Sequence, residues 1–215
     1  NLIDLHALDT THPALKDLGH PTGYTRRQVQ GWTTRYTQSQ TDDIPSMTQA
    51  AAWLLDDNNI PPDNRPAFIH NDYKYDNVIL NPTDPTQILA VLDWEMSTVG
   101  DPLMDLGTSL GYWLDADDPG FMRKLPFNHT ATPGNLNRLA LAERYTAKTN
   151  LPLDHILFYY VQALFKVAVI AQQIYRRFHD GATADPRFAH LIGAVRALSA
   201  QAALAISRRR IDRLG

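Results

Sequence analysis

The chain of 215 residues contains no cysteine. This absence excludes disulfides, thiolate zinc sites and thiol nucleophiles, and it suits a reducing compartment, so we expect a cytoplasmic protein. Neither sign of charge dominates, because 20 Lys and Arg residues stand against 23 Asp and Glu residues. A nearly neutral chain gives no general reason to expect nucleic acid or an acidic membrane surface as a partner. Functional sites must therefore be sought in local motifs.

Long apolar runs are also scarce. The most apolar stretch, Val161 to Ala171, is too short to cross a bilayer and is interrupted by Lys166. The first residues lack the basic and then apolar pattern of a signal peptide. We therefore expect no contact with a membrane.

The spacing of apolar residues predicts a mainly α protein with a small β-sheet, in the α+β class. Helical patterns cover residues 2–8 and 24–38, a run that begins at Ser46 as its N-cap, a run capped by Asp101, and residues 136–149, 153–179 and 186–214. Three short apolar runs at 67–69, 78–80 and 88–92 are bounded by Asn, Asp or Pro and predict strands of one sheet. The first helical pattern has neither a cap nor a start methionine, so we expect the chain to be part of a longer protein.

The motif with the clearest chemistry is His-Asn-Asp-Tyr-Lys-Tyr-Asp-Asn, residues 70–77, which lies between the first two predicted strands. Sixteen residues after Asn77, the third predicted strand ends at Asp93. We expect Asp72, Asn77 and Asp93 to converge at the edge of the sheet. Phosphoryl transfer needs a carboxylate that orients the attacking hydroxyl and hard oxygen ligands that hold magnesium, and these residues supply both.

The two motifs resemble those of the aminoglycoside phosphotransferase family, which has a protein-kinase-like fold. Residues 70–77 fit the kinase catalytic loop, and Leu-Asp-Trp-Glu-Met-Ser-Thr-Val-Gly-Asp-Pro-Leu-Met-Asp-Leu-Gly, from residue 92, is similar to the metal-binding segment of the family. The resemblance implies an ATP- and Mg²⁺-dependent enzyme that phosphorylates a hydroxyl of a small molecule. It gives the following roles: Asp72 as catalytic base, His70 as a brace of the loop, Lys74 near the transferred phosphate, Asn77 and Asp93 as ligands of magnesium and so of the nucleotide, Glu95 as a weaker metal candidate, and Asp105 as a second brace.

A narrower resemblance rests on Leu-Gly-His-Pro at residues 18–21, Arg-Gln-Val at 27–29, and Trp32. These residues are similar to the phosphotransferase-like domains found beside acyl-CoA dehydrogenases. The resemblance covers nearly the whole chain but only the second half of a kinase, since no glycine-rich loop or strand lysine precedes His70. We therefore expect residues 1–215 to form a single C-terminal lobe, with a catalytic and metal-binding core at 66–107 and a helical substrate-side region at 108–215. The N-terminal lobe of the same parent protein would be needed for activity.

Two other functions stay open. A metal-dependent hydrolase could use His70, Asp72 and Asp93 as ligands of a metal with an activated water, although such sites usually have more His or carboxylate ligands. A noncatalytic, kinase-like binding module is the other alternative.

The acidic residues Asp115, Asp117 and Asp118 could attract a cationic substrate, but a solvated acidic loop is the favoured interpretation.

Overall fold

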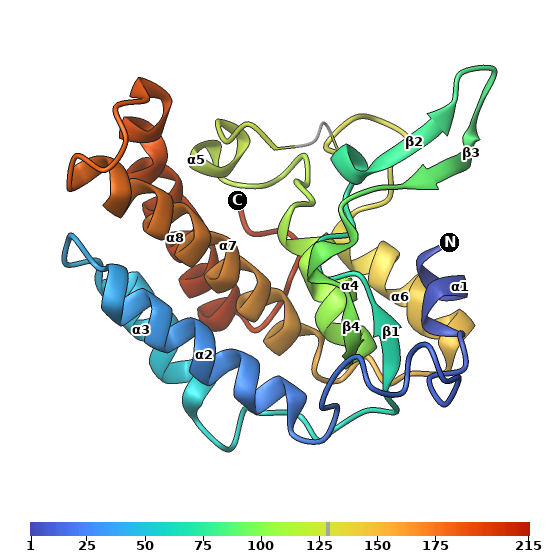
Figure 1. Cartoon of the computed structure of the whole chain (residues 1–215). Coiled ribbons are helices and arrows are strands. Elements are labelled where there is room, and N and C mark those ends of the chain that lie inside the picture. Colours follow the sequence, from blue (N-terminus) through green and yellow to red (C-terminus); the bar gives the residue numbers. More distant parts are fainter. Residues whose placement is uncertain (128–129) are drawn as a thin grey trace.

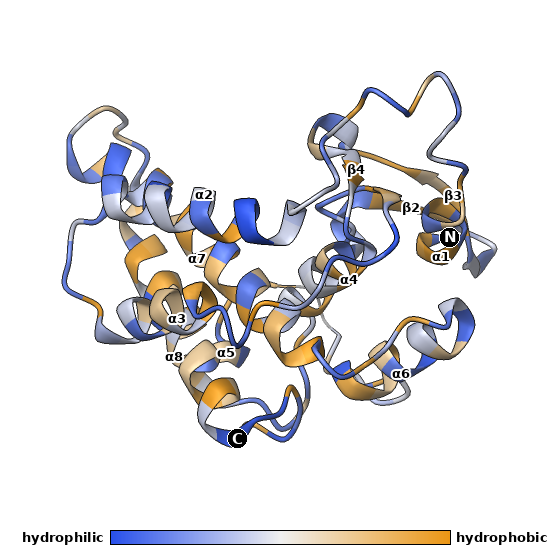
Figure 2. Cartoon of the chain, turned by 90° about the horizontal axis from the view of Figure 1, so that it is seen from below, coloured by the Kyte–Doolittle hydropathy of each residue, from blue (hydrophilic) through white to orange (hydrophobic). Residues whose placement is uncertain are grey.

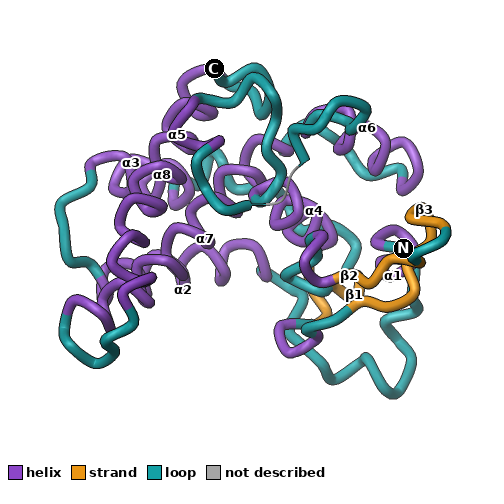
Figure 3. The backbone as a smooth tube through the Cα atoms, turned by 90° about the horizontal axis from the view of Figure 1, so that it is seen from above, coloured by secondary structure: helices purple, strands orange, loops and turns teal. Residues whose placement is uncertain are grey.

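The computed structural model describes residues 1–127 and 130–215 and has a mainly helical architecture with two small sheets (Figure 1). The strands gather on one side of the molecule and the long helices extend over the other (Figure 3). This arrangement confirms the predicted α+β class. In chain order the elements are α1 (Leu2–His6), α2 (Tyr24–Ser39), α3 (Pro45–Leu55), β1 (Ala67–Ile69), η1 (Tyr75–Asn77), β2 (Val78–Asn81), β3 (Asp84–Val91), η2 (Trp94–Met96), β4 (Thr98–Gly100), α4 (Pro102–Gly111), α5 (Gly120–Arg123), α6 (Arg138–Thr149), α7 (Ile156–His179), η3 (Pro186–His190) and α8 (Leu191–Arg208).

Helix α7 forms the centre of the helical side. Its residues are buried along most of its length, and Tyr160, Leu164 and Ala168 are fully buried. Helices α2, α3, α4 and α8 all pack against it. Hydrophobic colouring gathers along α7, whereas the outward side of α2 is largely hydrophilic (Figure 2). The helical layer therefore also includes α2 and α3, which come before residue 66 in the chain.

Helix α4 approaches α7 closely at two glycines that lie four residues apart on one face. A Cβ atom added to Gly107 would lie 2.6 Å from the carbonyl oxygen of Tyr159. A Cβ atom added to Gly111 would lie 2.9 Å from the Cβ of Ala163. Because no side chain stands between the two backbones, this contact fixes α4, and the residues it carries, against the helical layer.

The prediction of three strands in one sheet is wrong. The strands form two separate antiparallel pairs: β1 pairs with β4, with Ala67 opposite Gly100, and β2 pairs with β3, with Val78 opposite Val91. Strand β4 was not predicted, because its residues Thr98, Val99 and Gly100 do not form an apolar run of the kind that marks the predicted strands. The first and third predicted strands thus lie in different sheets, and the loop contacts described below connect them.

Two helix boundaries also differ from the prediction, whereas a third is confirmed. Helix α3 begins at Pro45 with Ile44 as its N-cap, and the Ser46 hydroxyl instead lies 2.7 Å from the hydroxyl of Ser199 on α8. The last predicted helix is divided into η3 and α8, and it ends where Arg209 adopts a left-handed conformation. Asp101 caps α4 as predicted, since its carboxylate accepts a hydrogen bond from the Leu103 amide at 2.8 Å.

Helix α7 and the segment Pro186–Arg208 are long and apolar enough to cross a membrane by length and composition alone. The apolar window of α7 is 78% buried within the fold, which is typical of a core helix. The window in Pro186–Arg208 is 33% buried, and α8 packs on α3 and α7. The absence of membrane contact stays a prediction.

Candidate active site

The loop of residues 70–77 leaves β1 and enters β2, so hydrogen-bonded strands fix both of its ends. Within it, the Asp72 carboxylate accepts hydrogen bonds from Lys74 Nζ at 2.8 Å and from Asn77 Nδ2 at 2.9 Å. Asn77 Nδ2 also donates to the backbone carbonyl of Asp72 at 2.8 Å. These bonds orient the Asp72 side chain, which is 20% exposed and so remains open to a ligand.

Tyr112, the residue that follows α4, stands beside this carboxylate. The Nζ atom of Lys74 lies 4.6 Å from the centroid of the Tyr112 ring. Burial raises the pKa of the Tyr112 phenol, and the charge of Asp72 and a hydrogen bond to it raise that pKa further. The phenol therefore keeps its proton at neutral pH and acts as a donor toward Asp72.

The fully buried carboxylate of Asp105, on α4, holds the start of the loop. Its two oxygens accept hydrogen bonds from the backbone amides of His70 and Asn71, each at 2.7 Å. One of these oxygens also lies 3.0 Å from Nε2 of His6, whose Nδ1 lies 2.6 Å from the hydroxyl of Tyr145. Charge-assisted hydrogen bonds to one carboxylate fix the positions of the His70 and Asn71 amides, so Asp105 connects the loop rigidly to α4.

His70 joins the loop to the end of β3. Its Nε2 lies 2.7 Å from the carbonyl oxygen of Leu92, and its Nδ1 lies 3.2 Å from the backbone nitrogen of Asp72. These partners require a proton on Nε2 and a free acceptor on Nδ1. The buried ring also packs on Trp94, with 4.8 Å between the ring centroids. Both nitrogens are therefore occupied, and the geometry is that of a brace.

Asn77 and Asp93 lie at the same end of the β2–β3 pair. The amide of Leu92 donates to the carbonyl oxygen of Asn77 at 2.8 Å, and Asp93 is the next residue. Asp93 has a left-handed backbone, with φ at 59°, which turns the chain out of the strand and into η2. Backbone strain of this kind is concentrated at functional sites. The fold thus brings Asn77 next to the Asp93 segment, and Asn77 in turn contacts Asp72.

The donor atoms at this position fit a hard divalent cation. Asn77 uses its amide nitrogen toward Asp72, so its side-chain oxygen is the atom that could bind a metal. Within the described ranges, the exposed carboxylate of Asp93 has neither a hydrogen bond nor an ion pair. Glu95, in η2, is also exposed. Carboxylate and amide oxygens are the ligands that Mg²⁺ prefers in proteins.

The ligand set of a hydrolase is not assembled. Among residues 1–127 and 130–215, no group of three or more His, Cys, Asp or Glu side chains could hold a metal ion. Both nitrogens of His70 are already bonded, so this ring is not free to join Asp72 and Asp93 around a metal. The arrangement suits a metal that takes its remaining ligands from a bound phosphate group better than one held by the protein alone.

Two residues that the sequence analysis did not assign to the site also fix the loop: Asn71, which belongs to it, and Lys166, which contacts it. Asn71 has a left-handed backbone, with φ at 65°, and its side-chain amide donates to the carbonyl oxygen of Met96 at 3.0 Å. Lys166, on α7, is 5% exposed and donates to the carbonyl oxygen of Asn71 at 2.7 Å. A lone charge inside the apolar run Val161 to Ala171 was the signal for Lys166, because a buried ammonium needs a polar partner.

Hollows lie on both sides of the loop. One of about 280 Å³ is lined by aliphatic, polar and aromatic residues, the last including Tyr73, Tyr112 and Trp113. The other, of about 510 Å³, lies on the side of Asn71 and Lys166. Both are therefore within reach of a substrate that contacts the loop.

Neither interpretation of the acidic residues holds for Asp115 and Asp118. Both are buried, because Arg138 at the start of α6 is also buried and needs counter-ions. Asp118 binds its guanidinium through both oxygens, each at 2.6 Å from a different nitrogen, and also accepts from Gln201 Nε2 at 2.8 Å. Asp115 lies 3.3 Å from the same guanidinium, and burial raises its pKa to about 6. Only Asp117 is exposed, so these carboxylates form a structural cluster.

Comparisons with known proteins agree with the geometry of the loop. Residues 1–128 match the model of the phosphotransferase enzyme family. The chain is 37% identical over 190 residues to acyl-CoA dehydrogenase family member 11 of Gallus gallus, a match that covers 84% of this chain and 23% of that protein. It is 33% identical to acyl-CoA dehydrogenase family member 10 of Mus musculus, over 84% of this chain and 17% of that protein. The chain thus spans less than a quarter of these relatives.

A solved structure from Ralstonia eutropha JMP134, described as an aminoglycoside phosphotransferase, superposes with a TM-score of 0.79. The two chains are 31% identical, and the match covers 92% of this chain and 60% of the other. Both resemblances seen in the sequence, to the aminoglycoside phosphotransferases and to domains of acyl-CoA dehydrogenase family members, are confirmed. The chain belongs to the phosphotransferase enzyme family and has its kinase-like fold.

Proposed function

We propose that this chain forms the catalytic lobe of a cytoplasmic kinase that transfers phosphate from ATP to a hydroxyl of a small molecule. One observation carries the proposal. The exposed edge of the Asp72 carboxylate is oriented by Lys74 and Asn77, and Asn77 adjoins the segment that carries Asp93. A proton acceptor and oxygen ligands for a metal are the two groups that phosphoryl transfer requires of the protein.

In this proposal, Asp72 orients the hydroxyl of the acceptor and takes its proton. Lys74, which already contacts Asp72, places a positive charge where the transferred phosphate would arrive. Asp105 and His70 hold the loop in place and do not touch the substrate. Positioning and electrostatic stabilisation would therefore do most of the catalysis.

Magnesium would be held by the side-chain oxygen of Asn77 and the carboxylate of Asp93, with Glu95 as a weaker candidate. Bound there, it would neutralise charge on the phosphates of the nucleotide. The protein's own contribution is to present these oxygens from a turn with fixed ends, since Asn77 lies in η1 and Asp93 caps η2.

The nucleotide would also need a surface that this chain provides only in part. Large apolar side chains of β2, β3 and η2 are exposed, among them Ile79 at 46%, Leu89 at 60% and Trp94 at 40%. An apolar face of this kind is suited to contact with an adenine ring and with an N-terminal lobe of the same parent protein. We therefore expect the 215-residue polypeptide alone to show little turnover.

The test uses the full-length parent protein with ATP, Mg²⁺ and a panel of small hydroxyl compounds, and follows the acceptor-dependent release of ADP. Replacing Asp72 by Asn should lower turnover by about 10²–10⁴-fold, the usual contribution of a general base. Replacing Asp93 by Asn should raise the Mg²⁺ concentration needed for half-maximal activity by at least about tenfold.

Asp117→Asn is the matched control, because Asp117 is an exposed aspartate outside the loop. It should leave both quantities unchanged, and circular dichroism checks that all variants are folded. Full activity of Asp72→Asn would overturn the assignment of the base. Binding of a small molecule without any turnover in the wild-type protein would favour the noncatalytic module.

A further inference from the structure

The hollow on the Asn71 side of the loop is a cleft of about 510 Å³ between α2, the loop and the η2–β4 segment. Helix α2 contributes residues at helical spacing, so one face of this helix forms a wall. That face carries Tyr24, Arg27, Trp32 and Arg35. The backbone of the preceding loop closes one end, where Gly19 lies too close to Thr98 for any side chain. The cleft thus has defined walls, and its lining includes Asn71, the residue before Asp72.

The charge of the cleft is positive. Its lining includes His20, Arg27, Arg35 and Lys166 but no Asp or Glu among the described residues. Arg27 is held by the backbone carbonyls of His20 and Thr22, which fix its guanidinium without neutralising it. The guanidinium groups of Arg27 and Arg35 and the ammonium of Lys166 present a positive potential that no carboxylate of the lining offsets.

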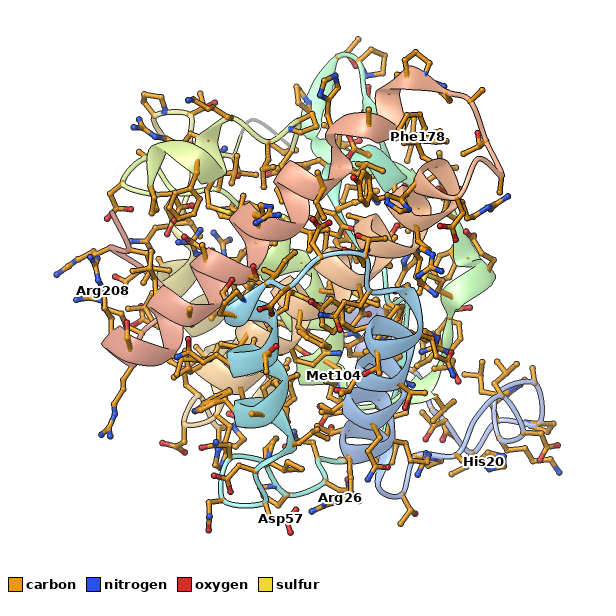
Figure 4. All side chains as sticks on the ribbon, turned by 90° about the vertical axis from the view of Figure 1, so that its left-hand side faces the viewer. His20, Arg26, Asp57, Met104, Phe178 and Arg208 are labelled. Atoms are coloured by element: carbon orange, nitrogen blue, oxygen red, sulfur yellow. The ribbon has the colours of Figure 1, made fainter. Side chains whose placement is uncertain are left out.

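Arg35 and Arg26 lie on the same helix but differ in their partners. The Arg35 guanidinium lies 4.6 Å from the centroid of the Trp32 ring, and it has no salt bridge to any residue of the described ranges. Arg26, on the outward side of the same helix, forms an ion pair with Asp57 at 2.6 Å (Figure 4). The unpaired arginines of α2 thus face the cleft, and the paired one faces away from it.

Lys166 lies at the floor of the cleft. Its ammonium donates one hydrogen bond, to the carbonyl oxygen of Asn71 at 2.7 Å, and an ammonium has three donors. Its side chain is 95% buried, since its exposed fraction is 5%. Burial lowers the pKa of Lys166 to about 8, while the charges of Asp72 and Asp105 limit this fall. At neutral pH most Lys166 side chains are therefore still charged, with donors that a ligand could complete.

We infer that this cleft binds an anionic group, a carboxylate or a phosphate, of the acceptor whose hydroxyl faces Asp72. The inference rests on the proposed function, because Asn71 and Lys166 connect the cleft to the catalytic loop. Lys166 and Arg35 hold the anion, and Arg27 adds long-range attraction. A polycationic acceptor such as an aminoglycoside is repelled by the same charges, so the site selects against it.

The test measures anion binding by calorimetry on the full-length protein, in low salt and without ATP. Separate titrations with inorganic phosphate, with hexanoate and with the polyamine spermidine distinguish the two anion chemistries from a cationic ligand. At least one of the two anions should bind, and spermidine should not bind at this cleft. Arg35→Gln and Lys166→Met should each weaken the anion affinity by about tenfold, as expected for loss of one charged hydrogen bond.

Arg26→Gln is the matched control and should bind the anions as the wild type does. Arg35 is exposed, so Arg35→Gln remains informative even if Lys166→Met fails to fold. Equal anion affinity in wild type and Arg35→Gln, or no binding of either anion, would overturn the inference. Anion binding that survives in Asp72→Asn while turnover is lost separates this inference from the proposed function, because each can then fail alone.

Discussion

At the residue scale, Asp105 fixes the backbone of the loop that carries the candidate active site, although it does not touch the substrate in the proposed mechanism. Its carboxylate satisfies the buried amides of His70 and Asn71. Asp105→Ala would leave both amides without acceptors, so we expect the free energy of unfolding to fall by about 2–5 kcal/mol. Urea denaturation measures this change. Asp117→Ala, at an exposed aspartate, should change stability by less than about 0.5 kcal/mol, and an equal effect of the two variants would refute the role of Asp105.

Lys166 predicts a specific dependence of stability on pH. Burial lowers the pKa of its ammonium to about 8 from an ordinary value of 10.5. Between these two values the folded state binds fewer protons than the unfolded state, so the free energy of unfolding rises with pH. The penalty of burying the charge is complete below about pH 8 and is relieved as the pH increases. The slope is at most about 1.4 kcal/mol per pH unit.

Lys166→Met provides the comparison, since it removes the Lys166 titration and keeps every other titratable group; the lost hydrogen bond to Asn71 lowers stability equally at all pH values above the titration of the carboxylates. The difference in unfolding free energy between wild type and Lys166→Met should change between pH 8 and pH 9.5. The charges of Asp72, Asp105 and Lys74 act on Lys166, and these three residues are present in both proteins. A difference that stays constant over this range would show that the Lys166 pKa is not lowered.

At this scale the sequence predicted what lies close together in the chain. Asp72, Lys74 and Asn77 fall within six residues, and their mutual contacts follow from one short loop. The link between Asn71 and Lys166 joins positions 95 residues apart, and no local pattern encodes such a pair. The roles of the site residues in catalysis stay predictions.

At the scale of the elements, the contact between α4 and α7 determines where Asp105 lies. Gly107→Ala would place a Cβ atom 2.6 Å from the backbone oxygen of Tyr159, so the helices must separate. We expect a loss of about 1–3 kcal/mol in unfolding free energy. Gly193→Ala, in α8, meets nothing within 4 Å and should be neutral or stabilising by up to about 1 kcal/mol. Thermal denaturation of both variants would contradict this account if Gly107→Ala were the more stable.

The buried cluster around Arg138 joins α6, the loop before α5, and α8. Asp118→Ala removes the two hydrogen bonds that the fully buried Arg138 guanidinium donates to the Asp118 carboxylate, and it should cost about 3–5 kcal/mol. Asp57→Ala breaks an exposed Asp–Arg pair instead and should cost less than about 1 kcal/mol. Urea denaturation compares them, and similar losses would contradict the structural role of this cluster.

The positions of the helices were largely predictable, because a buried stripe repeats every three to four residues along α2 and α6, and α7 is a long apolar segment that is buried on nearly all sides. The sheet was not. Strand β4 has the sequence Thr-Val-Gly, which is not an apolar run, and its pairing with β1 places Thr98 opposite Ile69, two residues that are distant in the chain. The burial of Asp115 and Asp118 was missed for a similar reason, since their partner Arg138 comes 20 residues after Asp118.

At the scale of the whole molecule, the chain presents two surfaces of different character. An exposed apolar face lies on β2, β3 and η2, and a positively charged cleft lies against α2 and α7. The loop of residues 70–77 leads into β2, and its residue Asn71 lines the cleft. We propose that a nucleotide approaches from the first surface and an anionic acceptor from the second, so that Asp72 stands where the two substrates meet.

The most direct test of this account is a crystal structure of the full-length protein with Mg²⁺ and a nonhydrolysable ATP analogue. We predict a magnesium ion bound to the Asn77 side-chain oxygen and the Asp93 carboxylate, with the terminal phosphate facing Asp72. A nucleotide bound away from the loop, or a metal that contacts neither Asn77 nor Asp93, would contradict the account.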